Sequence, residues 1–361
     1  AIISLLAYQR RGSKQPAAAT MPETPQVSAI LPARNEEANI AGAVQSLAQQ
    51  TLPVEIIVVN DASTDGTGGI LAQLQAQFPQ LRVIENDTVP EGWVGKSYAI
   101  SRGVEQARAP WLLFTDADVR HQPEAVAKAL ATARKTGSAL VSYAPEQEMP
   151  TWWEQAVIPL VSCRLAKQFS YRQVSNPEHR AAAASGQWLM MSRIAYDAVG
   201  GHAGVRDDIL EDVALARRVK GTGCRIYFAR GADIATTRMY QCFRDMWEGW
   251  SKNLFLLFDR RCRAVARAVG AALLDLAVLV VTLVALASSA LLVAEVAAGV
   301  LLFRHLQYAT ALARNRYPLS SLLYYEVGNA LVAAMMLNSA RKYLRGEPIQ
   351  WKGRLYATSK Q

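Results

Sequence analysis

Two carboxylates stand two residues apart directly after an apolar run of the sequence. Asp116 and Asp118 follow residues 111–115 (WLLFT), so both can approach one divalent cation. A hard cation such as Mg²⁺ or Mn²⁺ takes oxygen ligands and keeps positions open for substrate phosphates. It stabilises negative charge on a departing diphosphate. An Asp-x-Asp also occurs in turns and helix caps, so its position in the fold decides between these interpretations.

Two more polar segments follow apolar runs in the same way. Residues 32–37 (PARNEE) follow the run 27–31, and residues 60–67 (NDASTDGT) follow the run 55–59. Thr64 or Asp65 can cap the next helix, which leaves Asp61 to face a nucleotide. Lys96 precedes another helical stretch, where it meets either phosphate or solvent.

The intervening pattern predicts an α/β fold that positions these segments. Apolar runs without polar alternation predict strands at 27–31, 55–59, 81–85, 111–115 and 139–143. Helical spacing predicts helices at 38–50, 66–78, 97–107 and 124–136. This alternation is typical of a mostly parallel sheet with helices on both faces, which binds ligands at the carboxyl ends of its strands. The three polar segments should therefore meet at one edge.

The composition indicates membrane segments. The 361 residues are 51% hydrophobic and 19% charged, with a net charge of +9, whereas soluble domains are about 25% charged. The basic residues lie beside apolar segments, which argues against nucleic-acid binding. The four cysteines include no Cys-x-x-Cys pair, which argues against a zinc site or a disulfide framework.

The second half of the chain carries the longest apolar stretch. Residues 265–303 are about twice the length of one membrane span, so we expect two spans with a turn near Ser288–Ser289. The alternative is a buried helix pair in a soluble core. A third stretch, 319–337, lies between basic clusters, so we expect it to be re-entrant or interfacial.

These features divide the chain into five expected regions. Residues 1–14 are the end of a truncated membrane helix, or alternatively a frayed soluble N-terminus, and 15–25 are a linker. Residues 26–260 form the catalytic domain, 261–343 the membrane region and 344–361 a basic cytoplasmic tail.

The order and spacing of the motifs resemble a known family. VSAILPARNEEANIAGAVQSL, EIIVVNDASTDGT and GKSYAISRGVEQARAPWLLFTDAD look like the nucleotide-binding half of family-2 glycosyltransferases of the GT-A fold. The resemblance covers roughly residues 26–260. The segment EGWVGKSYA together with the late WKGRLY resembles a membrane subgroup associated with hopanoid and carotenoid biosynthesis.

The resemblance implies roles on the donor side. The donor-binding residues would be Pro32, Ala33, Arg34, Glu36, Asp61, Lys96, Asp116 and Arg244. The loop after the first strand and Asp61 would contact the uracil and ribose of a UDP-sugar. Asp116 and Asp118 would hold Mg²⁺ or Mn²⁺, with Asp118 the closer ligand.

It also implies an acceptor side. Gly186, Gln187 and Trp188 would belong to the acceptor loop, and Glu211-Asp212 resembles the family's acidic motif. Asp212 would be the general base that deprotonates the acceptor hydroxyl, with Asp208 in reserve. The competing interpretation is that these are acidic residues in the first turn of a helix.

Residues 241–250 (QCFRDMWEGW) partly resemble the Gln-x-x-Arg-Trp motif of processive members. No aromatic residue follows Arg244 directly, and Trp247 and Trp250, assigned here to the acceptor side, come later. An interfacial amphipathic helix is the other interpretation.

The sequence thus predicts an inverting, metal-dependent transferase. It would move a sugar from a nucleotide-sugar to a lipid or membrane-associated acceptor. It would sit in a bacterial-type inner or plasma membrane with its catalytic domain in the cytoplasm. The alternatives are a processive polysaccharide synthase and a non-catalytic nucleotide- or lipid-binding scaffold. An NAD-binding oxidoreductase would need G-x-G-x-x-G where this chain has PARNEE.

Overall fold

The structure, a computed structural model, describes residues 25–351 and 353–356. The expected N-terminal helix end, 1–14, and nearly all of the linker lie outside the described residues. The main sheet has eight strands in the order β3-β2-β1-β4-β7-β6-β8-β5. Their bounds are β1 Val27–Ala33, β2 Val54–Asn60, β3 Leu81–Glu85, β4 Trp111–Thr115, β5 Val119–His121, β6 Ser138–Gln147, β7 Trp188–Ser192 and β8 Arg225–Thr237.

The sheet is parallel where the sequence predicted it to be, and mixed beyond. Strands β1 to β4 run parallel, and β6 and β8 are parallel to each other. β7 inserts between β4 and β6 and runs antiparallel to both. The mostly parallel α/β class is confirmed, and the antiparallel β7 comes from the region whose pattern the sequence left mixed.

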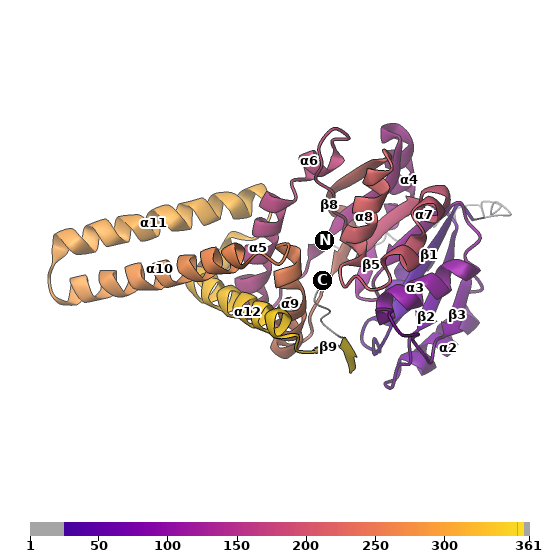
Figure 1. Cartoon of the computed structure of the whole chain (residues 1–361), viewed down its shortest axis with the longest axis horizontal. Helices are drawn as coiled ribbons and strands as arrows, with labels where there is room; N and C mark the ends of the chain where they lie inside the picture. Colours follow the sequence, from indigo (N-terminus) through magenta and orange to yellow (C-terminus); the bar gives the residue numbers. More distant parts are fainter. Residues whose placement is uncertain (1–24, 352, 357–361) are drawn as a thin grey trace, which may run out of the picture.

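Helices cover both faces of the sheet, as predicted (Figure 1). Helices α1 (Ile40–Ala48), α2 (Thr67–Gln77) and α4 (Ala125–Thr136) pack on one face in one apolar cluster. On the other face a second cluster contains residues of α3 (Gly95–Gln106), α6 (Tyr171–Ser175), α7 (Arg193–Ala198) and α8 (Glu211–Gly221). The central strands are buried on both sides, which explains their continuous apolar sequence.

One predicted boundary was wrong. The sequence predicted that Pro32 ends the first strand, but β1 continues through Ala33 and pairs Pro32 with Val59 of β2. The ladder between β1 and β4 stops at Ile30. Pro32 therefore needs no hydrogen-bond partner on β4, and its missing N–H costs nothing there.

A third core lies among helices that come mostly from the C-terminal half of the chain. This cluster contains residues of α5 (Trp152–Gln168), α9 (Phe243–Leu257), α10 (Cys262–Ala287), α11 (Leu291–Arg314) and α12 (Tyr325–Arg345). The third apolar stretch of the sequence becomes a short 3₁₀ helix, η2 (Leu319–Tyr324), and the first part of α12. Figure 1 shows α10 and α11 projecting from the rest of the molecule as a long hairpin.

The projecting hairpin exposes its apolar side chains. Helices α10 and α11 are long and apolar enough to cross a membrane, and only 17% of the most apolar window of each is buried. Leu274, Leu283 and Leu292 are 52%, 58% and 75% exposed. Burying one such side chain is worth about 1.5–3 kcal/mol, so this surface suits a bilayer better than water. The predicted turn is present, with Ser289 at φ 54° between the helices.

Charged and amide groups face the inside of this helical region. The Asp275 carboxylate is 1% exposed and forms an ion pair with Arg304. Asn329 donates to Asp275 at 3.0 Å and accepts from Arg164 at 2.8 Å. These contacts tie α10, α11, α12 and α5 together.

The last described residues form a small hairpin. β9 (Ile349–Trp351) and β10 (Arg354–Tyr356) pair antiparallel after α12. Figure 1 shows β9 beside the catalytic domain, away from the tip of the α10–α11 hairpin. The expected tail 344–361 thus begins as the end of α12 and then folds back.

Candidate active site

The carboxyl ends of the parallel strands meet at one edge of the sheet, as the sequence predicted. The backbone N–H of Asp61, after β2, donates to the carbonyl of Ala33 at the end of β1, at 2.7 Å. The N–H of Asn86, after β3, donates to the carbonyl of Asn60 at 2.9 Å. The polar segments after β1, β2 and β3 are thereby fixed side by side.

The Asp61 carboxylate is buried at this edge, with 4% of the residue exposed. Asn86 Nδ2 donates to Asp61 Oδ1 at 2.7 Å. Arg34 Nη1 donates to the backbone carbonyls of Asp61 and Ala62 at 2.7 Å and 3.0 Å. Ala62 has φ 51°, so the chain turns sharply here. A carboxylate has further acceptor capacity that a ligand N–H or O–H could use.

The loop after β1 is fixed to the loop after β2 by its backbone. Glu36 N donates to Thr67 Oγ1 at 2.8 Å, and Glu37 N donates to Asp65 Oδ2 at 3.1 Å. Asp65 also accepts from Thr67 N at 3.0 Å. The N-cap of α2 is Gly66, so Asp65 binds the first N–H of the helix from one residue before the cap position that the sequence suggested for Thr64 or Asp65. Pro32 and Ala33 form the end of β1 beneath this loop.

Lys96 connects the segment after β4 to the start of α8. It lies in the first turn of α3, and its Nζ is 2.7 Å from Asp116 Oδ1 and 3.0 Å from Glu211 Oε1. Burial disfavours the ammonium form, but Asp116 and Glu211 outweigh it and hold the pKa of Lys96 well above its usual value. Residues from β4, α3 and α8 therefore form one charged cluster.

Asp212 joins this cluster through Gly186. The backbone N–H of Gly186 donates to Asp212 Oδ2 at 2.7 Å. A Cβ at position 186 would lie 3.2 Å from Lys96 Nζ and 3.3 Å from Asp212 Oδ2, so only glycine leaves this space open. Burial and the neighbouring Glu211 carboxylate raise the pKa of Asp212 to about 6, against the opposing effect of Lys96.

The two carboxylates after β4 fit a shared metal ion. Among the described residues, no group of three or more His, Cys, Asp or Glu side chains could hold a metal. Mg²⁺ in nucleotide sites commonly takes one or two protein carboxylates and completes its coordination with phosphate oxygens and water. Asp116 and Asp118 are oxygen donors of the kind such an ion takes, and Asp116 already pairs with one cation, the Lys96 ammonium.

The residues predicted for the acceptor loop differ in their burial and contacts. Thr115 Oγ1, next to Asp116, donates to the carbonyl of Gln187 at 2.8 Å. This contact fixes the loop 185–188 against the end of β4. Trp188 is fully buried and packs edge-on against Tyr143, so its side chain supports the loop from below.

Arg244, Trp247 and Trp250 do not reach the charged cluster. Arg244 is 84% exposed along its side chain and pairs with Glu248 at 3.1 Å on the same helix. Trp250 is 5% exposed in the helical core, and Trp247 is partly buried against the same core. Gln241 of the same motif lies 3.4 Å from Asn39 Oδ1. The donor and acceptor roles of these residues remain predictions.

Asp208, the reserve base, lies apart from Asp212. A cavity of about 390 Å³ opens between α8 and the end of α9, and its lining includes Asp208. Leu210, Val213, Ala214 and Arg217 also line it, and this spacing belongs to one face of a helix. Asp212 lies on the opposite face with Lys96 and Gly186. Burial and the adjacent Asp207 raise the pKa of Asp208.

Two residues that contact Asp61 at this edge were not predicted from the sequence. Asn86 follows β3 as Asp61 follows β2, so the strand-end rule that found Asp61 would have found it too. Arg354 of β10 forms an ion pair with Asp61. The available signal was the Lys352-Gly353 pair between two short β-prone runs, a pattern typical of a two-residue hairpin.

Comparison with known proteins places these residues in a wider context. The family model described as "Glycosyl transferase family 2" matches residues 28–213. This range contains the four charged residues of the cluster, Lys96, Asp116, Glu211 and Asp212. The 4,4'-diaponeurosporenoate glycosyltransferase of Staphylococcus haemolyticus is 30% identical over 238 residues, 64% of this chain and 61% of that protein. The protein of the same name from Staphylococcus aureus is 30% identical over 230 residues, 62% and 60% of the two chains.

This chain spans about 60% of the length of these curated relatives. Among solved structures, a mannosyltransferase from Pyrobaculum calidifontis, in complex with GDP-Man and Mn²⁺, aligns with a TM-score of 0.54. It covers 94% of each chain at 21% identity. The likeness extends through the helical half, and it confirms the predicted fold.

Proposed function

Since the chain belongs to glycosyl transferase family 2, we propose that it is an inverting hexosyltransferase that moves a sugar from a UDP-sugar to a lipid acceptor at a membrane. The observation that carries the proposal is the cluster of Lys96, Asp116, Glu211 and Asp212 around Gly186. Motifs about a hundred residues apart meet there. A scaffold that only binds ligands has no need of a carboxylate with a raised pKa beside a cation-holding carboxylate.

The donor occupies the carboxyl edge of β1, β2 and β4. Its nucleoside lies along the Arg34 loop and Asp61, and its diphosphate lies toward Lys96 and Asp116. A divalent ion bound by Asp116 and Asp118 would supply electrostatic stabilisation of the diphosphate leaving group. The Lys96 ammonium adds positive charge on the same side, held in place by Asp116 and Glu211.

Asp212 acts as the general base on the acceptor side. Its carboxylate takes the proton of the acceptor hydroxyl while the hydroxyl oxygen forms a bond to the anomeric carbon. The bond from that carbon to the diphosphate breaks, and its electron pair leaves with the nucleotide. Gly186 N–H orients Asp212. A pKa of about 6 keeps the base largely ionised at neutral pH.

The lipid acceptor and the membrane follow from the helical half. The exposed apolar surfaces of α10 and α11 suit acyl chains. Arg261 precedes α10, Arg263 lies in its first turn, and Arg314 and Arg316 lie at the end of α11, so both ends of the hairpin lie on the cytoplasmic side with the catalytic domain. Relatives named for 4,4'-diaponeurosporenoate support an apolar acceptor.

The test is nucleotide release and sugar transfer by the purified protein. UDP-, GDP- and TDP-sugars are offered with a lipid extract, in Mn²⁺ or in EDTA. We expect EDTA-sensitive release of UDP from one donor and radiolabelled sugar in the lipid phase. Asp118→Ala should lose the EDTA-sensitive part. Nucleotide release from no donor would refute the transferase. Equal activity in EDTA would rule out metal dependence and, with it, the proposed metal-binding roles of Asp116 and Asp118.

A further inference from the structure

The C-terminal hairpin returns the chain to the nucleotide end of the proposed donor site. α12 ends at Arg345, and Gly346 takes φ 66°. β9 and β10 follow, with Gly353 at φ 76° between them. A Cβ built on Gly353 would lie 3.8 Å from Arg34 Nη2. The tip of the hairpin therefore touches the Arg34 loop, which is 319 positions earlier in the chain (353 − 34).

Arg354 uses this position to bind the buried Asp61 carboxylate. Arg354 Nη2 donates to Asp61 Oδ1 at 2.9 Å, and Nη1 pairs with Oδ2. The side chains are 19% and 6% exposed. This is the two-pronged contact in which a guanidinium fixes both the position and the plane of a carboxylate. Lysine offers no such fork.

The Asp61 carboxylate still has room for one more donor. An ionised carboxylate has about four lone-pair sites. Asn86 and Arg354 Nη2 take two on Oδ1, and Arg354 Nη1 takes one on Oδ2. One site on Oδ2 remains for a ligand. Arg354 and Asn86 therefore fix the orientation of the carboxylate and leave one acceptor position on it.

We propose that Arg354 is a positioning residue of the nucleotide site: the C-terminal hairpin completes the nucleoside end of the donor pocket by orienting Asp61 for a ligand N–H. The inference rests on the proposed function and names what that site recognises. The fitting base is uracil, whose N3–H donates. Cytosine carries an acceptor at N3, so an oriented carboxylate repels it.

Two other roles for the hairpin predict different behaviour. A plug would have to leave before the nucleotide enters, and its departure would strip a buried carboxylate of two of its three described side-chain hydrogen bonds. A passive strap would stabilise the fold without touching recognition. The free lone pair on Oδ2 and the contact of Gly353 with the Arg34 loop favour positioning.

The experiment compares nucleotide binding by full-length variants in detergent. Arg354→Ala should weaken UDP binding about 10- to 100-fold, because hydrogen bonds to a charged group contribute about that much to affinity. The KM for the UDP-sugar should rise likewise, with kcat little changed. The preference for UDP over CDP should shrink by the same factor. Arg354→Lys should restore only part of both. Arg345→Ala, which removes an exposed arginine paired with Glu347, is the matched control and should bind as the wild type.

A double variant tests whether Arg354 works through Asp61. Asp61→Asn should weaken UDP binding, and Asp61→Asn/Arg354→Ala should be no weaker than the poorer single variant. If Arg354→Ala proves too unstable to purify, Gly353→Ala strains the turn at φ 76° and displaces the guanidinium without removing it. It should reproduce the loss of UDP preference.

The outcomes separate the two proposals. The positioning role alone would be overturned if the wild type binds UDP and a folded Arg354→Ala variant binds UDP with the same affinity and the same preference over CDP. Tighter UDP binding by Arg354→Ala would overturn it in favour of a plug. A wild type that binds no nucleoside diphosphate would overturn the proposed function and this inference together.

Discussion

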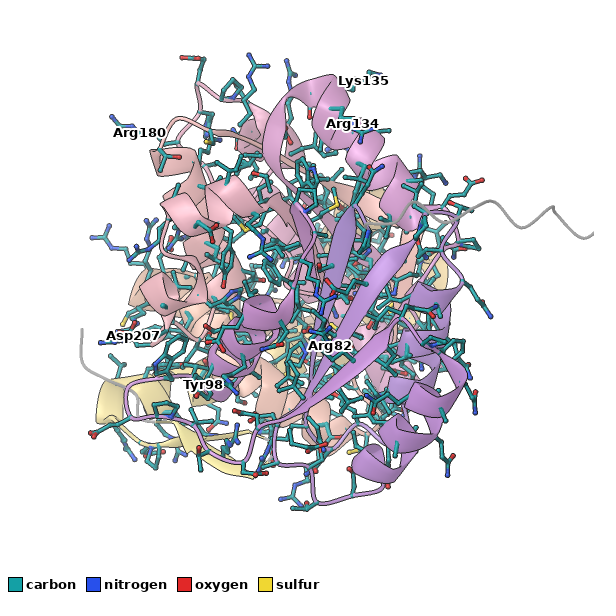
Figure 2. All side chains as sticks on the ribbon, turned by 90° about the vertical axis from the view of Figure 1, so that its right-hand side faces the viewer. Arg82, Tyr98, Arg134, Lys135, Arg180 and Asp207 are labelled. Atoms are coloured by element: carbon teal, nitrogen blue, oxygen red, sulfur yellow. The ribbon has the colours of Figure 1, made fainter. Side chains whose placement is uncertain are left out.

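The catalytic domain and the α10–α11 hairpin place their charges in opposite ways. In the catalytic domain the strands are buried and charged side chains point outward, as Figure 2 shows for Arg134, Lys135 and Arg180. In the hairpin, leucines and valines face outward, and Asp275 with Arg304 lies inside. Apolar side chains thus lie inside the sheet domain but on the outer surface of the hairpin, which is the arrangement that the proposed membrane location requires.

The buried charges of the two regions also differ in purpose. In the catalytic domain, Lys96 is shared between two carboxylates and Asp212 keeps a raised pKa. In the hairpin, Asp275 is held by Arg304 and Asn329 at fixed positions. In the proposed mechanism the first cluster performs the chemistry, whereas the second ties helices together. Substitutions should separate the two.

The largest effect should come from the base. Asp212→Asn should lower kcat about 10²- to 10⁴-fold because the acceptor hydroxyl keeps its proton, while UDP binding and thermal stability stay near wild type. Steady-state transfer and calorimetric UDP titration measure both. Asp208→Asn, across α8 in the cavity wall, is the control and should keep nearly full activity. The reverse result would make Asp208 the base.

Arg304→Leu should act on the helical region and leave the chemistry alone. It leaves Asp275 buried without its cation, which costs about 3–5 kcal/mol. Thermal unfolding in detergent should show the loss. Replacing both partners, Asp275→Leu/Arg304→Leu, should recover part of the stability because the two charges of the pair are removed together, although Asn329 loses its acceptor and Arg164 its neighbouring carboxylate. A double variant as unstable as Arg304→Leu would mean that Asp275 and Arg304 stabilise the helices by more than neutralising each other's charge.

A matched pair of leucine and isoleucine substitutions tests the two solvents directly. Leu283 on α10 is 58% exposed, and Ile194 on α7 is 84% exposed. Leu283→Lys should cost about 2.5–3.5 kcal/mol in a bilayer, whereas Ile194→Lys in water should stay within about 0.5 kcal/mol. Membrane integration and unfolding in nanodiscs report the difference. Two equally mild effects would place the hairpin in water.

The smallest effect should be a shift in a pH profile. The Glu211 carboxylate raises the pKa of Asp212, and the base works only when ionised, so kcat/KM should rise with pH through about 6. Glu211→Gln removes the like charge and should move this rising limb to lower pH. Asp212→Asn should abolish the limb. A limb that Glu211→Gln leaves in place would belong to another group.

The sequence predicted most of the parallel half of the fold. Strands at 81–85 and 111–115 match β3 and β4 residue for residue. β4 is a buried parallel strand and has an unbroken apolar sequence, whereas β3 lies at the edge of the sheet and buries only Leu81. Strand β7 escaped because its neighbours β4 and β6 come from distant parts of the chain. No local pattern reports that kind of pairing.

The site divides in the same manner. Asp61, Asp116 and Asp118 were predictable since strand ends locate them. The link from Lys96 to Glu211 depends on how α3 and α8 pack, which lies beyond local sequence. Arg244 was expected near the diphosphate, but helical spacing pairs it with Glu248, four residues later. The contact of Arg354 with Asp61 depends on the C-terminal hairpin packing beside the loop after β2, and local sequence does not report such a contact.

The contact between Arg354 and Asp61 joins residues 293 positions apart, and this fixes an order of assembly during synthesis. Chains emerge and fold from their N-terminus, so Asp61 leaves the ribosome long before its partner. α10, α11 and α12 lie between the two residues. The proposed nucleotide pocket can therefore be completed only after these helices have been made, and a chain released before that point would lack the contact between Arg354 and Asp61.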